Sequence, residues 1–222
     1  MPSSIFITRD ERDDSPFFKN PRKQGLHVFG QSLIQLDPVD FELTKMPDWF
    51  FFYSKNGVRF FFGKKVEIKE VKFAAFGPST AELIKQLTNK EVSFIGTGDA
   101  ISTAEAFKKK SQPTDSVCFV RAHHSLQSIS KLMGDHCQSD SLIVYNNRMA
   151  PLNPTPAADI YVVTSPMNAR SLLLEGDIKK NAPMIAIGHT TREELEKLGM
   201  TNINIADKPN EESLVKAVIN QL

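Results

Sequence analysis

Short apolar runs alternate with longer amphipathic stretches along most of the chain. The apolar runs are rich in Val, Ile and Phe and have the length of buried strands. They cover residues 5–8, 71–76, 92–95, 117–120, 141–145, 159–164, 183–187 and 202–206. Stretches with helical spacing cover residues 80–87, 126–134, 191–198 and 212–222. Strands that alternate with helices predict an α/β fold whose parallel sheets are covered on both faces.

This pattern of strands and helices occurs twice in the sequence. An apolar run followed by a serine and a helix start ends at Ser54 and again at Ser165, an offset of 111 in position. A run that ends in glycine and a hydroxyl-rich helix start recurs at the same offset, from Gly77 to Gly188. Apolar runs that end in arginine recur at Arg9 and Arg121, an offset of 112. Spacing this constant indicates two copies of one α/β unit, and the chain length of 222 is twice 111.

Two divisions of the chain into lobes are compatible with the repeat. The segments 36–38 and 146–156 are polar, contain proline and are suited to linkers. If both are crossovers, residues 1–35 and 148–222 form a discontinuous first lobe. Residues 39–145 then form an inserted second lobe, with 36–38 and 146–147 as the hinge. The alternative is two sequential halves divided near Gln112-Pro113.

Both repeated motifs lie where parallel sheets bind ligands, beyond the carboxyl ends of the strands. A helix that starts there presents backbone N–H groups and a positive dipole end, which suit a carboxylate or a phosphate. Ser79, Ser102 and Thr190 each precede a Glu by three residues, which predicts capping boxes at three helix starts. Hydroxyl groups that only cap their helices are the structural alternative. Matched sites in both copies favour an anion bound between the lobes.

Charge, hydrophobicity and cysteine content exclude several classes of protein. Lys and Arg number 27 against 26 Asp and Glu, a net charge of +1, so no global field favours nucleic acid or an anionic membrane. The longest apolar cluster, around Phe51, is far too short to span a membrane, and the acidic N-terminal segment predicts no signal peptide. Two cysteines, Cys118 and Cys137, suit a reducing compartment and are expected to be buried. These features predict a soluble cytoplasmic protein.

Three other motifs point away from nucleotides and metals. Gly96-Thr97-Gly98-Asp99 lacks the third glycine of a dinucleotide fingerprint, and the Gly57 to Lys64 segment lacks phosphate-loop spacing. His123, His124 and His136 have no carboxylates at the spacing of a metal site. No metal is therefore expected.

Tyr145 is a candidate for chemistry. It ends an apolar run just before the second predicted linker, where its phenol is expected to face the ligand. A tyrosine can donate a proton or a hydrogen bond without carrying charge at neutral pH. A tyrosine that only packs at a hinge is the alternative.

Taken in order, the motifs resemble one family over almost the whole chain. They are Thr8-Arg9, the Ser54 turn, Phe76-Gly77-x-x-Thr80, Leu142-Ile143-Val144-Tyr145, the run from Tyr161 to Pro166, and Ile187-Gly188-x-Thr190-Thr191. This set resembles the uroporphyrinogen-III synthase family. The resemblance implies an α/β fold of two Rossmann-like (flavodoxin-like) lobes with parallel sheets, joined by a two-stranded hinge, with the first lobe discontinuous. It also implies a reaction of heme biosynthesis, in which hydroxymethylbilane loses water and closes to uroporphyrinogen III with inversion of ring D.

The resemblance implies a set of site residues and no cofactor. Tyr145 matches a tyrosine proposed to protonate the leaving hydroxyl. The substrate-binding residues implied with it are Ser54, Lys55, Ser79, Thr80, Ser165, Pro166, His189, Thr190 and Thr191. Lys55 and His189 depart from the usual turn residues of the family and could add contacts to carboxylates. A monomer is expected, with transient contact with the bilane-producing enzyme and no nucleic-acid or membrane partner. The alternative function is a two-lobed module that binds small anions without catalysis.

Overall fold

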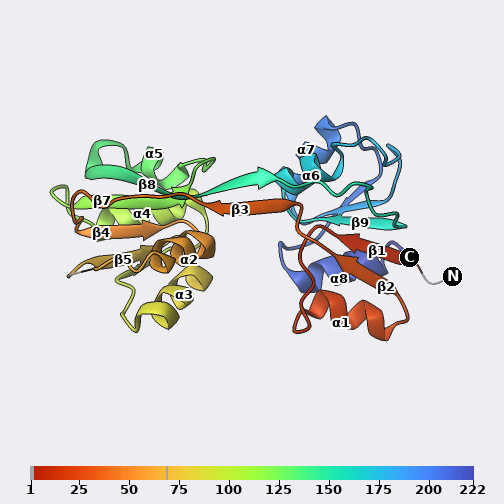
Figure 1. Cartoon of the computed structure of the whole chain (residues 1–222), viewed down its shortest axis with the longest axis horizontal. Helices are drawn as coiled ribbons and strands as arrows, with labels where there is room; N and C mark the ends of the chain where they lie inside the picture. Colours follow the sequence, from red (N-terminus) through yellow and green to blue (C-terminus); the bar gives the residue numbers. More distant parts are fainter. Residues whose placement is uncertain (1–2, 69) are drawn as a thin grey trace. The chain divides into compact units, whose positions relative to one another are not determined.

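The computed structural model describes residues 3–68 and 70–222, and the chain divides into two compact units (Figure 1). Unit 1 contains residues 1–35 and 148–222, and unit 2 contains residues 36–147. The chain passes from unit 1 to unit 2 through strand β3 (Ile34–Pro38) and returns through strand β8 (Gln138–Met149).

Unit 1 is built on a five-stranded parallel sheet in the order β11-β10-β9-β1-β2. Its elements are β1 (Ser4–Ile7), α1 (Pro16–Lys23), β2 (His27–Gly30), β9 (Ile160–Val163), α6 (Pro166–Leu172), β10 (Met184–Ala186), α7 (His189–Lys197), β11 (Ile203–Ile205) and α8 (Glu211–Ile219). Apolar residues of α1 and α8 pack in one buried cluster and those of α6 and α7 in another, so both faces of this sheet are covered.

Unit 2 is built on a six-stranded sheet in the order β3-β8-β7-β4-β5-β6. Its elements, besides β3 and β8, are β4 (Trp49–Phe52), α2 (Lys55–Gly63), β5 (Lys72–Ala75), α3 (Pro78–Thr88), β6 (Phe94–Ile95), α4 (Ala100–Lys110), β7 (Ser116–Ala122), α5 (Ser128–Met133) and the 3-10 helix η1 (Gly134–His136). Helices α2 and α3 lie on one face and α4 and α5 on the other (Figure 1). The prediction of an α/β fold with parallel sheets covered on both faces is confirmed.

The apolar runs form strands because both of their faces are buried. In β4, Phe50 and Phe52 pack against α2 and α3, while Trp49 and Phe51 pack against α4 and α5, and all four side chains are buried. Burial of a side chain of this size contributes about 1.5–3 kcal/mol. This explains why the strand reads as a continuous apolar run rather than as an alternation.

Strand register identifies which parts of the two units correspond. Ile5 pairs with Ile160 in unit 1, and Val117 pairs with Trp49 in unit 2. Strand β1 therefore corresponds to β7, and β9 corresponds to β4, at the offsets of 112 and 111 found in the sequence. The strand order around these pairs is also the same in the two sheets.

A matched aspartate–serine contact supports this correspondence at the amino ends of the same strands. Asp159 accepts hydrogen bonds from the backbone N–H and the hydroxyl of Ser4, both at 2.8 Å. Asp48 accepts the same pair of bonds from Ser116, at 2.8 and 2.7 Å. These hydrogen bonds lower the pKa of both carboxyl groups, those of the backbone N–H most. The sequence pattern did not predict this contact.

The segments 36–38 and 146–147 are those predicted as the two-stranded hinge. They form part of β3 and β8, which are neighbours in one sheet. The N–H of Val39 donates to the carbonyl of Val144 at 3.1 Å, and the N–H of Ala150 donates to that of Leu33 at 2.8 Å. The chain therefore runs in opposite directions in these strands. Backbone pairing makes them strands in spite of their polar, proline-containing sequence.

The three predicted capping boxes are wrong. Helices α3 and α7 begin directly after Gly77 and Gly188, earlier than predicted, and neither has a side-chain cap. Helix α4 is capped by Asp99, whose carboxylate accepts a hydrogen bond from the N–H of Ser102. Ser79, Ser102 and Thr190 all lie inside the first helical turn.

Candidate functional site

Ser54 and Ser165 occupy the same position in the two units, directly before a helix. The hydroxyl oxygen of Ser54 accepts a hydrogen bond from the N–H of Gly57 at 3.1 Å, and that of Ser165 accepts one from the N–H of Asn168 at 3.1 Å. Both serines are partly buried and cap α2 and α6. Each hydroxyl accepts in its capping bond, so its proton is left for a second contact. The predicted helix starts at these serines are confirmed.

The glycine turns before α3 and α7 form a second matched pair. The first helical hydrogen bonds run from Thr80 N–H to the Gly77 carbonyl at 3.1 Å and from Thr191 N–H to the Gly188 carbonyl at 3.2 Å. Thr80 and Thr191 are buried, so Thr191 is the counterpart of Thr80. Thr190, also predicted to bind substrate, is exposed.

The other predicted binding residues stand at the first or second position of the same four helices. Lys55 begins α2 and His189 begins α7, and both side chains are exposed. Pro166 begins α6 and is half-buried. Ser79 lies at the second position of α3, where it is exposed like Thr190. Each unit therefore carries its half of the predicted set at the carboxyl ends of its strands.

Tyr145 lies within β8 rather than at its end, because the strand continues to Met149. Its side chain is 8% exposed and belongs to the apolar cluster beneath α2. The ring stacks on Phe60, with centroids 5.1 Å apart, and the hydroxyl lies 3.3 Å from the hydroxyl of Ser54. The structure thus brings together two of the predicted site residues that are 91 positions apart in the chain.

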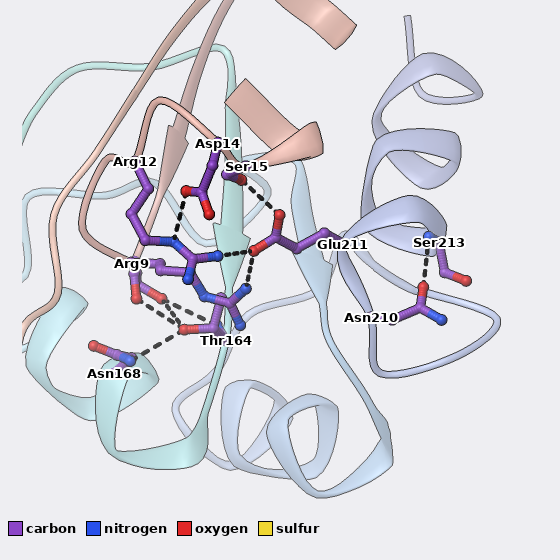
Figure 2. Close-up of polar contacts among 10 residues, drawn as sticks. Arg9, Arg12, Asp14, Ser15, Thr164, Asn168, Asn210, Glu211 and Ser213 are labelled. Carbon is purple, nitrogen blue, oxygen red and sulfur yellow. Dashed lines mark hydrogen bonds and ion pairs between the residues drawn. The ribbon is translucent and has the colours of Figure 1, made fainter. Parts of the chain in front are cut away.

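Two arginines and a serine converge on Glu211 at the start of α8 (Figure 2). Arg9 and Arg12 donate to the same carboxylate oxygen at 2.9 and 2.8 Å, and the Ser15 hydroxyl donates to the other at 2.6 Å. The Glu211 side chain is 14% exposed. Burial raises the pKa of Glu211, but the hydrogen bond from Ser15 and the charges of the two arginines outweigh it, so the pKa lies below its ordinary value.

Beside this cluster, threonines join the carboxyl ends of β1 and β9 (Figure 2). The Thr164 hydroxyl donates to the Thr8 carbonyl at 2.8 Å, and the Thr164 N–H donates to the Thr8 hydroxyl at 3.0 Å. The Asn168 amide donates to the Thr164 hydroxyl at 3.2 Å and accepts from the N–H of Leu33 at 3.0 Å. Sequence reasoning missed this network and the Glu211 cluster, because their members are up to 202 positions apart.

Other predicted groups are placed as follows. Cys118 and Cys137 are buried and free, as expected. Burial raises the pKa of Cys118 to about 12, with a smaller contribution from Asp140. Within residues 3–68 and 70–222, no cluster of three or more His, Cys, Asp or Glu side chains could hold a metal ion. The same part of the chain has no helix long and apolar enough to cross a membrane.

Comparison with known proteins identifies the family. The family model described as uroporphyrinogen-III synthase HemD matches residues 17–216. The chain belongs to the uroporphyrinogen-III synthase family. This family cyclises hydroxymethylbilane to uroporphyrinogen III with loss of water and inversion of ring D, so the chain is a cyclising lyase of heme biosynthesis.

Solved uroporphyrinogen-III synthases have the same fold at low sequence identity. The enzyme from Helicobacter pylori is 19% identical with a TM-score of 0.77, and the alignment covers 100% of both chains. A mutant of the Thermus thermophilus enzyme is 15% identical with a TM-score of 0.63, over 99% of this chain and 100% of that one. The chain has no significant sequence match among curated proteins.

Proposed function

We propose that the starts of α3 and α7 bind carboxylates of hydroxymethylbilane. The observation that carries this proposal is that both helices follow a glycine at the carboxyl end of a strand and have no side-chain cap. Helices α2, α4, α6 and α8 are capped by the side chain of the preceding residue, and α1 and α5, which also lack such a cap, do not follow a glycine. An uncapped helix start presents N–H groups and a positive dipole end to an anion. The exposed hydroxyls of Ser79 and Thr190 stand beside these N–H groups and can donate to the same carboxylate.

Binding through backbone donors also agrees with the net charge of the chain. The substrate carries eight carboxylates, yet the net charge is only +1. Backbone N–H groups and hydroxyls bind anions without a dense basic patch. Lys55 and His189 are exposed at the starts of α2 and α7, where each could add one charged contact.

Tyr145 is the proposed proton donor for loss of the hydroxyl group. Its proton passes to the departing hydroxyl, which leaves as water, and the bilane becomes an azafulvene-like cation. The Ser54 hydroxyl, 3.3 Å from the phenol oxygen, is positioned to orient it. The cation forms readily, so the larger task of the enzyme is to hold the bilane in the conformation from which closure with inversion occurs.

Strands β3 and β8 are the proposed hinge, because the chain passes between its two units only through them. Two paired strands allow the units to move as bodies while their separate cores stay intact. A monomeric state, a cytoplasmic location and transient contact with the bilane-producing enzyme belong to the same proposal.

The test is incubation of the purified chain with freshly prepared hydroxymethylbilane, followed by chromatographic separation of the oxidised isomers. We expect the III isomer to form in excess over the I isomer that arises without enzyme. A product made only of the I isomer would contradict the proposal. Tight binding of the bilane without turnover would instead favour a binding module.

A further inference from the structure

Arg121 is a buried cation without a carboxylate partner in unit 2. It lies near the carboxyl end of β7 and is only 9% exposed. The Nη1 group donates to the carbonyls of Ala122 at 3.0 Å and His123 at 3.1 Å. The Nε group is buried and has no hydrogen-bond partner. Among the residues that the structure describes, no carboxylate forms an ion pair with it.

An unpaired buried guanidinium is costly, because burial removes its water without replacing every hydrogen bond. The pairing of β7 with β8 shifts register between Arg121 and Ala122. The extra residue of this irregularity is Val144 of β8, and such irregularities are common next to binding sites. The position of Arg121 therefore favours a ligand that completes its hydrogen bonds.

Arg121 lines a pocket of about 470 Å³ that is open to solvent. Lys131 of α5 and Asp140 of β8 also line it, with Gln127 and Ser141 as uncharged polar groups. Two cations and one carboxylate leave the pocket with a net positive charge. Asp140 accepts a hydrogen bond from the N–H of Ser141 at 2.7 Å and is exposed, so it neutralises neither cation directly.

The corresponding position in unit 1 has an internal anion. Arg9 stands where Arg121 stands, because Ile5 and Val117 occupy the same register position. Arg9 is neutralised by Glu211 of the same unit at 2.9 Å. A carboxylate pairs with the arginine in unit 1, which indicates that an oxyanion suits the guanidinium of Arg121 as well.

We infer that the pocket beside Arg121 and Lys131 binds an oxyanion, a carboxylate or a phosphate. A planar guanidinium pairs with either through two hydrogen bonds, and Lys131 adds a second charge. The oxyanion can be a side-chain carboxylate of the bilane or a free small anion. The first source rests on the proposed function, and the second is independent of it.

The direct test follows the Arg121 Nε–Hε resonance by NMR in the ¹⁵N-labelled full chain. Inorganic phosphate is titrated in at constant ionic strength, with chloride as the replaced ion, and the titration is repeated with citrate. We expect the resonance to shift and saturate with both anions. A resonance that stays in place, or that moves equally with chloride, overturns the inference.

Variants distinguish anion binding by this pocket from attraction to the overall charge of unit 2. Arg121→Gln should abolish phosphate binding, measured as at least a tenfold loss of affinity. Lys131→Gln should weaken it about threefold, and it keeps the inference testable if the buried substitution fails to fold. Lys109→Gln is the matched control, since it removes one exposed positive charge from α4 of the same unit. A Lys131→Gln affinity equal to that of the control would overturn the two-cation pocket.

Steady-state kinetics then identify the source of the oxyanion. If it is a bilane carboxylate, Lys131→Gln raises the KM for hydroxymethylbilane about threefold, leaves kcat unchanged, and phosphate competes with substrate. If it is a free anion, the KM of Lys131→Gln equals that of Lys109→Gln. The Arg121 Nε–Hε resonance still shifts when phosphate is added. Failure of the isomer assay leaves the NMR result standing, so failure of the proposed function and failure of this inference remain distinguishable.

Discussion

An arginine lies at the same register position at the carboxyl ends of β1 and β7, but the two arginines have different partners. At the end of β1, Arg9 shares the Glu211 carboxylate with Arg12. At the end of β7, Arg121 donates to the backbone carbonyls of Ala122 and His123, and its Nε has no partner among residues 3–68 and 70–222. In unit 1 this position contributes to an internal ion-pair cluster, whereas in unit 2 we infer that it binds a ligand.

The residues beside each arginine also differ between the two units. In unit 1, Thr8 and Thr164 bond to one another across β1 and β9. In unit 2 the corresponding positions hold Val120 and Tyr53, and the Tyr53 hydroxyl accepts from the N–H of Ser130 at 2.9 Å. Two copies of one architecture thus differ in the polar groups at these strand ends.

The largest effect is expected when the unit 1 anion is removed. Glu211→Ala leaves Arg9 and Arg12 without their carboxylate and should lower the free energy of unfolding by about 2 kcal/mol, because charge-assisted hydrogen bonds are lost. Denaturant unfolding measures this loss. Glu212→Ala, at the exposed neighbouring position, is the control. Equal stability of the two variants would show that the Glu211 cluster does not support unit 1.

The lowered pKa of Glu211 predicts that its contribution to stability depends on pH. The pKa of Glu211 is lowered in the folded state, so its contribution is fully present above the unfolded-state pKa, about 4.3. It is lost as the pH falls through the lower folded-state value. The difference in unfolding temperature between the wild-type chain and Glu211→Gln should therefore shrink from pH 6 to pH 3. A constant difference over this range would argue against the ion pairs.

Loss of the Tyr145 hydroxyl tests the chemistry assigned to unit 2. Tyr145→Phe should reduce turnover about tenfold or more, equivalent to about 1.4 kcal/mol, and leave folding intact because the ring still stacks on Phe60. Tyr161→Phe in unit 1 is the matched control. Its hydroxyl donates to the Pro156 carbonyl at 3.0 Å and accepts from the Ala158 N–H at 3.2 Å, so it should cost about 1 kcal/mol of stability without affecting turnover.

Unchanged turnover in Tyr145→Phe would make Tyr145 a packing residue of the unit 2 core. An equal loss of turnover in both tyrosine variants would attribute the effect to stability rather than to proton donation.

A smaller effect is expected at the exposed hydroxyls of the uncapped helices. Ser79→Ala in unit 2 and Thr190→Ala in unit 1 should each raise the KM for hydroxymethylbilane about threefold, because each removes one donor to a carboxylate. Steady-state kinetics measure both values. Ser102→Ala is the comparison, since α4 is already capped by Asp99. Two unchanged KM values would argue that the carboxylates are bound elsewhere.

The smallest effect is expected at Cys118. Burial raises the pKa of its thiol to about 12, so almost no reactive thiolate exists at pH 8. Alkylation of the native chain by iodoacetamide, read by mass spectrometry, should leave Cys118 unmodified, whereas the denatured chain reacts. Rapid native labelling would show that the β7 end of unit 2 opens far more readily than its packing suggests.

Sequence patterns predicted the backbone of the fold better than its polar contacts. The apolar runs at 71–76 and 183–187 contain buried strands because continuous burial on both faces requires such runs. The helix starts after Ser54 and Ser165 were also predictable, since a serine cap is a local signal. The family follows from the order of these motifs.

Contacts between distant segments could not be predicted in the same way. The Glu211 cluster joins residues up to 202 positions apart, and no local sequence pattern predicts these contacts. Thr80 and Thr190 were both predicted to bind substrate, yet Thr80 is buried and Thr190 is exposed, and residue type alone does not distinguish these environments. The capping boxes predicted at Ser79 and Thr190 were wrong because their helices begin directly after a glycine, and the box at Ser102 was wrong because Asp99 caps α4.

The insertion of unit 2 between β2 and β9 has a consequence for the order of folding. Unit 2 is one continuous segment, so it can form its sheet while the rest of the chain is still being synthesised. Strand β1 must wait for β9, because Ile5 pairs with Ile160, which follows the whole of unit 2 in the chain. Since the ends of unit 2 are held together by the pairing of Val39 with Val144, its folding shortens the loop that unit 1 must close. We therefore expect unit 2 to act as a template that brings the two halves of unit 1 together during synthesis.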